Sequence, residues 1–157
     1  PSHRSEPIIV MSQDVFIRKG QIEDAPAIAQ LMRGLGYNYS AAEIARRWSL
    51  AENPSLNPVF TAVRGDHYVG VIALHIAPLL FYPQPLARIT TLVVNHQNRR
   101  RGIGRALVEK AVQVSRAAGC DTIELTSGLH RTDAHAFYES LGFMNLAIRM
   151  ECPIAAS

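Results

Sequence analysis

The spacing of apolar positions alternates along the chain between the period of a strand and the period of a helix. Residues 15–18, 59–64 and 68–76 are short runs rich in β-branched and aromatic side chains, which are typical of strands. Gly65 and Asp66 separate the last two runs and predict a hairpin. Further strands are predicted at 88–94, 121–126 and 143–152, and the Pro-rich residues 81–85 are predicted to form a loop.

Four segments carry apolar residues at helical spacing. The first covers 20–36, and Gly36 is expected to end it. The second begins after Ser40, because Glu43 three residues later completes a capping box, and it is expected to end near Asn53 and Pro54. Two more helices are predicted at 102–118 and 132–141, each followed by a glycine.

The predicted element order is β-α-α-β-β-β-α-β-α-β, which indicates a mixed α/β (α+β) fold. No internal repeat or linker interrupts it, so residues 14–152 are expected to form a single domain. Residues 1–13 are expected to be a flexible tail, in which Met11 is a candidate natural start, and residues 153–157 are expected to be a C-terminal tail.

Composition narrows the classes of partner and compartment. The chain of 157 residues has 16 Lys and Arg against 13 Asp and Glu, and its net charge of +3 favours neither nucleic acid nor membrane as a partner. Cys120 and Cys152 match no zinc spacing, so we expect no metal and a reducing, cytoplasmic location. No apolar run approaches the ~20 residues of a membrane span.

A basic glycine turn, RRRGIGR (99–105), follows the predicted strand 88–94 and opens the predicted helix. Glycines let a ligand approach the backbone, and unpaired N–H groups at a helix start attract anions, so the turn suits a phosphate or pyrophosphate. A solvated basic loop is the alternative. A dinucleotide-binding turn is excluded because Leu107 stands where the third glycine is needed, and no Walker sequence is present.

Two motifs resemble those of the GNAT superfamily of acetyl-CoA-dependent N-acetyltransferases. Arg99–Gly104 (RRRGIG) resembles its R-x-x-G-x-G signature, and residues 134–143 (AHAFYESLGF) are similar to its A-x-x-[FL]-Y-x-x-x-G-F string. The resemblance extends over 15–152 and implies a mixed, mostly antiparallel sheet flanked by helices. It also implies direct transfer of acetyl from acetyl-CoA, the co-substrate, to a primary amine. The overall pattern is most similar to small-amine types such as the aminoalkylphosphonate acetyltransferases.

The resemblance also assigns roles to individual residues. It implies that Tyr138 is a general acid for the leaving thiolate, although a core aromatic is the plain alternative, and that the Val93 N–H stabilises the oxyanion. The family's glutamate base is absent from residues 88–92, so His75 is the candidate base or water relay. The residues implied to bind acetyl-CoA are Leu92, Val93, Val94, Arg99, Arg100, Arg101, Gly102, Ile103, Gly104, Arg105, Arg131, Ala134 and Tyr138.

The acceptor is expected to be a small-molecule amine, bound by Tyr37, Tyr39, Glu43 and Tyr82. Glu43 has the competing interpretation that it only completes the capping box of Ser40. A protein N-terminal or lysine acetyltransferase, and a non-catalytic acetyl-CoA-binding module, remain alternatives. Nucleic-acid binding through Arg99–Arg101 is disfavoured by the small net charge. Dimers are common in the family, so a homodimer is a further expectation from the resemblance.

Overall fold

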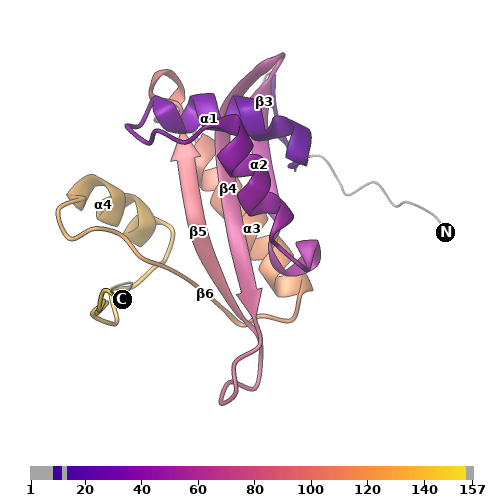
Figure 1. Ribbon diagram of the computed structural model, residues 1–157. Coiled ribbons are helices and arrows are strands. Elements are labelled where there is room, and N and C mark those ends of the chain that lie inside the picture. Colours follow the sequence, from indigo (N-terminus) through magenta and orange to yellow (C-terminus); the bar gives the residue numbers. More distant parts are fainter. Residues whose placement is uncertain (1–8, 12–13, 155–157) are drawn as a thin grey trace.

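Residues 9–11 and 14–154 are described by the structure, a computed structural model, as one sheet with helices packed on its faces (Figure 1). The strands are β1 (Ile9–Met11), β2 (Val15–Lys19), β3 (Val59–Arg64), β4 (His67–Ala77), β5 (Leu86–Val94) and β6 (Thr122–Leu125). The α-helices are α1 (Ala25–Arg33), α2 (Ala41–Ser49), α3 (Ile103–Ala117) and α4 (Thr132–Ser140), and the short 3₁₀ helices are η1 (Ile22–Asp24), η2 (Pro54–Leu56) and η3 (His96–Asn98).

The strands lie in the sheet in their chain order, β1-β2-β3-β4-β5-β6. Each of the first four strands pairs antiparallel with the next, and only β5 and β6 are parallel. The parallel pair is possible because α3 carries the chain back across the sheet between them. The predicted mixed, mostly antiparallel sheet is therefore confirmed.

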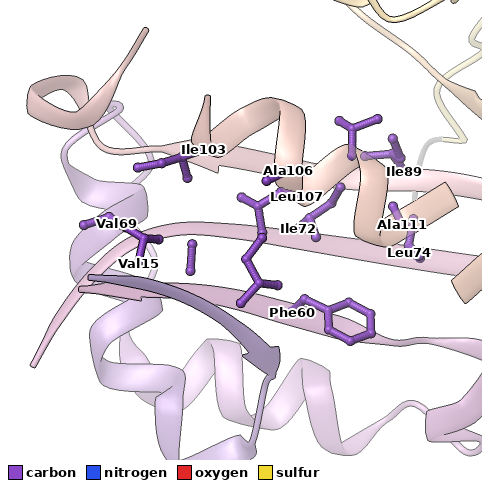
Figure 2. Packing of buried hydrophobic residues seen from close by; sticks show 13 residues of the cluster. Val15, Phe60, Val69, Ile72, Leu74, Ile89, Ile103, Ala106, Leu107 and Ala111 are labelled. Atoms are coloured by element: carbon purple, nitrogen blue, oxygen red, sulfur yellow. The ribbon is translucent and has the colours of Figure 1, made fainter. Parts of the chain in front are cut away.

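Helices cover both faces of the central strands. On one face, Ile103, Leu107 and Ala111 of α3 pack against side chains from β2 to β5, among them Phe60 and Ile72 (Figure 2). On the other face, α1 and α2 lie across β4 and β5, where Ile28 and Leu31 pack against Val71 and Val93 (Figure 1). Burial on both faces explains why β4 reads as a nearly continuous apolar run.

Most element boundaries agree with the sequence pattern, and the capping box of α2 is confirmed. The Ser40 N–H donates to Glu43 Oε2 at 2.8 Å, and the Glu43 N–H donates to Ser40 Oγ at 3.1 Å. The first helix is shorter than predicted, because η1 precedes it and Pro26 in its first turn favours a start there. Helix α2 ends at Ser49, before the predicted stop at Asn53.

The strand predicted at 143–152 was wrong, since this segment has no regular structure. Its alternating pattern favours extended backbone, but a strand also needs a neighbour to supply hydrogen bonds. Conversely, Ile9–Met11, which we placed in the tail, pair with β2. A segment of three residues is too short to show the two-residue alternation of a strand. The other residues of the expected tails, 1–8, 12–13 and 155–157, lie outside the described residues.

A buried carboxylate joins three elements at the start of α1. Asp24 is 5% exposed, and both of its oxygens accept hydrogen bonds from the Arg18 guanidinium of β2 at 2.8 Å. The Tyr68 hydroxyl of β4 donates to Asp24 Oδ1 at 2.5 Å, and the Gln21 N–H donates to Oδ2 at 2.9 Å. Burial alone would raise the pKa of Asp24, but these donors lower it to about 2.

We predict that Asp24→Asn lowers the free energy of unfolding by about 2–3 kcal/mol at pH 7, because it removes a buried charge-assisted pair. The folded-state pKa of about 2 lies below the ordinary value of 3.8, so the stabilisation is complete above the unfolded-state pKa and is lost as the pH falls toward 2. Urea unfolding at several pH values should show that the difference in free energy of unfolding between wild type and variant becomes smaller in acid. Asp66→Asn, on the exposed β3–β4 turn, is the control. A difference in free energy of unfolding that does not change with pH would contradict a stabilising role for the ionised Asp24 carboxylate.

Candidate active site

Strand β5 loses one of its two neighbours halfway along its length. It pairs with β6 only from Leu86 to Ile89, whereas its pairing with β4 continues to Val94. In the paired half, a side-chain hydrogen bond also joins the two strands, since Arg88 Nε of β5 donates to Glu124 Oε1 of β6 at 2.7 Å. Beyond Ile89, the outer edge of β5 therefore has no strand beside it among the described residues, and its main-chain groups on that side face open space.

A β-bulge lies at the point where the two strands part. The register between β4 and β5 passes from Ala73–Thr91 to Leu74–Ile89, so Thr90 is an extra residue without a direct partner. Its Oγ1 donates to the Ala73 carbonyl at 3.2 Å. A bulge bends a strand and increases its twist, so Thr90 redirects the remainder of β5 away from β6.

The hydrogen-bond alternation of β5 shows which main-chain groups face the open edge. The Asn95 N–H donates to the Val69 carbonyl at 2.9 Å, and Val93 lies opposite Val71 in the same register. In an antiparallel pair, N–H groups two residues apart point to the same side. The Val93 N–H is therefore directed toward β4, and those of Leu92 and Val94 toward the open edge. This alternation favours Leu92 or Val94 over Val93 as an oxyanion donor.

The basic turn leads from β5 to the start of α3. Gly102 is the N-cap residue with a φ of 77°, in the left-handed region that favours glycine, and no side chain caps the helix. The first N–H groups of α3 are thus left for another acceptor. Arg64 Nη1 of β3 donates to Oδ1 of the buried Asn98 at 2.6 Å, which fixes η3 ahead of the turn.

Gly104 has a packing role that the sequence did not indicate. A Cβ atom at this position would lie 3.2 Å from Cζ of Phe137, so the missing side chain lets α4 approach the first turn of α3. Phe137 and Tyr138 are neighbours on α4, with ring centroids 5.2 Å apart. The close contact at Gly104 therefore also determines how near Tyr138 lies to the open edge of β5.

One cavity of about 1000 Å³ joins these features. Its lining includes Tyr37, Tyr39 and Arg47 from the region of α1 and α2, and Arg99, Arg131 and Tyr138 from the basic turn and α4. Leu92, Val93 and Val94 of β5 also line it. A space of this size is large enough for a small ligand and part of a longer one.

Tyr138 has the protonation state that a proton donor needs. Burial raises the pKa of its hydroxyl above the ordinary value of 10, and the nearby charge of Arg131 opposes that effect only in part. The phenol is therefore protonated at neutral pH. Its ring also packs edge-on against Phe143, at a centroid distance of 5.7 Å.

Several predicted residues lie outside the cavity lining. The Glu43 carboxylate accepts the Ser40 N–H in the capping box, and Tyr82 is 59% exposed on the β4–β5 loop. His75 is also outside the lining, although its Nδ1 lies 2.8 Å from Oδ1 of Asn57, which does line the cavity. The turn residues Arg100, Arg101, Gly102, Ile103, Gly104 and Arg105, together with Ala134, surround the site without lining this cavity.

Arg47 is one of the charged cavity residues that sequence reasoning missed. Its guanidinium carbon lies 4.5 Å from the centroid of the Tyr39 ring, which in turn stacks on Tyr37 at 6.3 Å. Arg46 and Arg47 stand side by side in the sequence, and nothing in that pair indicates which one faces inward. Only the orientation of α2 on the sheet distinguishes them.

Comparison with known proteins gives the family. Residues 26–143 match the profile of the Acetyltransferase (GNAT) family. The chain belongs to this family. It is 35% identical over 82 residues to the aminoalkylphosphonate N-acetyltransferase of Salmonella typhimurium, covering 52% of this chain and 53% of that protein. It is 29% identical over 128 residues to N-alpha-acetyltransferase 30 of Xenopus laevis, covering 80% of this chain and 44% of that protein.

The chain thus spans about half the length of these curated relatives. A putative acetyltransferase from Agrobacterium tumefaciens has a similar structure, with a TM-score of 0.78 and 27% identity over 88% of this GNAT chain and 99% of the other. Glucosamine-6-phosphate N-acetyltransferase from Arabidopsis thaliana has a TM-score of 0.77 at 20% identity, over 91% and 100% of the two chains, which is a likeness of fold. Across residues 9–11 and 14–154, no helix is both long and apolar enough to cross a membrane.

Proposed function

We propose that this GNAT protein transfers the acetyl group of acetyl-CoA to the primary amine of a small molecule. The proposal rests on one observation: the main-chain groups that would bind the cofactor and the side chain that would donate a proton lie around the same cavity. The open edge of β5 leads to the uncapped start of α3, and the cavity beside that edge also contains Tyr138. The likeness to an aminoalkylphosphonate N-acetyltransferase supports a small amine as acceptor.

The residues around the open edge fit acetyl-CoA in chemistry. Its pantetheine arm carries amide groups, which the outward main-chain groups of Leu92 and Val94 would bind as a neighbouring strand does. Its pyrophosphate is an anion, which suits the free N–H groups of α3 and the guanidinium of Arg99. Arg100, Arg101 and Arg105 are exposed around the same turn and add positive charge there.

The chemistry requires a neutral amine, a stabilised oxyanion and a protonated leaving group. The amine nitrogen attacks the thioester carbonyl, a C–N bond forms, and the C–S bond breaks. In this proposal the Leu92 N–H stabilises the developing negative charge, and the protonated Tyr138 phenol supplies a proton to the leaving sulfur. The proton lost by the amine must leave through another group, because an alkyl ammonium has a pKa of ~10.

His75 is our candidate for the base that accepts this proton, through a water molecule at the edge of the cavity. Asn57 Nδ2 donates to the Asn53 carbonyl at 3.1 Å, so Asn57 Oδ1 faces His75 as an acceptor. His75 Nδ1 then carries the hydrogen, and Nε2 keeps the lone pair that a base needs. The strand at 88–92 has no carboxylate that competes for this role.

Arg47 points to an acceptor amine that also carries an anionic group. It contributes a positive charge to the cavity from α2, where its guanidinium lies over the Tyr39 ring. A phosphonate or carboxylate would bind its guanidinium in a forked arrangement, which favours such amines over neutral ones. The second candidate is a peptide N-terminus, favoured by the likeness to N-alpha-acetyltransferase 30.

We predict that Tyr138→Phe lowers kcat by at least about tenfold and leaves the affinity for acetyl-CoA nearly unchanged, because the phenol acts on the leaving thiolate. The measurement is release of free thiol from acetyl-CoA with a panel of aminoalkylphosphonates, other small amines and short peptides. Tyr82→Phe, an exposed tyrosine outside the cavity, is the matched control. Binding of acetyl-CoA without thiol release for any acceptor would contradict catalysis and support a binding module.

We predict that Arg47→Met raises the KM for phosphonate- or carboxylate-bearing amines by about 10- to 100-fold, the effect of losing a charge-assisted hydrogen bond. The KM for uncharged amines should hardly change, since methionine keeps the apolar stem over Tyr39. Arg46→Met, on the same helix but outside the cavity lining, should have no effect. An equal loss for charged and uncharged amines, or preferred turnover of peptides, would contradict an anionic acceptor.

A further inference from the structure

The cavity has a floor of three side chains that lie in a row across the sheet. Ala73 of β4 is opposite Val59 of β3 on one side and Thr91 of β5 on the other, and all three line the cavity. Directly opposed residues of antiparallel strands present their side chains on the same face of the sheet. Because neighbouring strands are about 4.8 Å apart, this cavity floor extends over about 10 Å.

Helix α1 covers the neighbouring row of the same face and leaves the cavity floor partly open. Thr61, Val71 and Val93 lie two residues away along the same three strands and are 0%, 2% and 5% exposed. Val71 and Val93 pack against α1. Ala73 is only half-buried, although its strand is at the centre of the sheet. The small side chain of Ala73 therefore leaves room for a ligand group above it.

The side chains that surround this room are apolar. They belong to the same apolar cluster as Val71 and Val93, and they also line the cavity: Met32, Leu35, Ile44, Trp48 and Val59. A hydrocarbon or aromatic group that enters this space leaves water and gains free energy in proportion to its buried apolar area. This part of the cavity thus suits an apolar group of the acceptor.

The charges around the cavity separate two kinds of amine. Within the described part of the chain, Asp133 of α4 is the only carboxylate in the lining, so α1, α2 and the cavity floor offer none to a second ammonium group. A polycationic acceptor is therefore disfavoured there. Arg47 lies three residues after Ile44 on α2, which puts their Cβ atoms roughly 5–6 Å apart. An anion at Arg47 and an apolar group beside Ile44 must accordingly be close together in the ligand.

We propose that the acceptor carries an apolar side chain and an anionic group on the carbon that bears the amine, and that the cavity floor around Ala73 holds that side chain. The class is that of hydrophobic α-amino acids and their α-aminoalkylphosphonate analogues. Arg47 binds the anion, and Ala73 sets the depth available to the side chain. This inference rests on the proposed acetyl transfer, but it concerns the size of the acceptor, so the two can fail separately.

Turnover of matched acceptors tests this preference. We expect kcat/KM to be at least about tenfold higher for leucine than for glycine, because each buried methylene contributes roughly fourfold. The phosphonate analogues of the two, 1-amino-3-methylbutylphosphonate and aminomethylphosphonate, should differ in the same direction, and comparison of the pairs identifies the preferred anion. Equal kcat/KM within both pairs, or a preference for the smaller members, would overturn the inference and leave acetyl transfer intact.

A binding measurement tests the same site without turnover. Calorimetry in the presence of CoA compares 4-methylpentanoate, which is leucine without its amine, with acetate. We expect 4-methylpentanoate to bind at least about tenfold more tightly. Equal affinities would overturn the inference even if no amine released thiol, whereas tighter binding of 4-methylpentanoate without thiol release would contradict acetyl transfer alone.

Substitutions at Ala73 test where the side chain binds. Ala73→Leu fills the space above the cavity floor and should lower the ratio of kcat/KM for leucine over glycine by at least about tenfold. Ala73→Val adds less volume and should lower the same ratio by less. Ala77→Leu is the matched control, because Ala77 is half-buried on the same side of β4 and outside the lining, so the ratio should stay at the wild-type value.

Circular dichroism and acetyl-CoA affinity show whether each variant keeps the fold. A wild-type ratio in folded Ala73→Leu and Ala73→Val, or the same fall in Ala77→Leu, would show that the cavity floor does not select the acceptor.

Discussion

The parting of β5 from β6 after Ile89 is the constraint on which the candidate site depends. A buried sheet normally pairs the main-chain groups of every inner strand, and leaving them unpaired is unfavourable. Here β4 continues to hold one side of β5 up to Val94, while the bulge at Thr90 turns the other side outward. The outward groups of Leu92 and Val94 therefore need a hydrogen-bonding partner that the sheet does not supply, and an extended ligand rich in amides meets that need.

The surrounding elements hold the two ends of this opening in place. At its carboxyl end, Asn98 is fixed by Arg64, and Gly102 then begins α3 in a conformation that glycine adopts without strain. Across the opening, Phe137 packs where Gly104 has no side chain, which brings α4 and Tyr138 to the same cavity. Burial keeps the Tyr138 phenol protonated. Binding groups and proton donor are thus held by the same contacts that form the core.

The local elements of the fold were predictable because their signals are local. The reciprocal bonds of Ser40 and Glu43, the hairpin at Gly65 and the glycine turn into α3 each depend on a few neighbouring residues. The bulge at Thr90 was not predictable, since a bulge exists only relative to the partner strand. Three other features could not be predicted because they also depend on contacts between residues distant in sequence. They are the direction of the Val93 N–H, the inward position of Arg47 and the unpaired state of residues 143–152.

Amide hydrogen exchange, followed residue by residue with and without CoA, tests the central claim most directly. If the open edge of β5 and the start of α3 bind CoA, exchange should slow at Leu92 and Val94 and at Ile103, Gly104 and Arg105. The Val93 amide already faces β4 and should change much less. Protection confined to other parts of the chain, or equal at Leu92, Val93 and Val94, would contradict the claim that this edge is the binding surface.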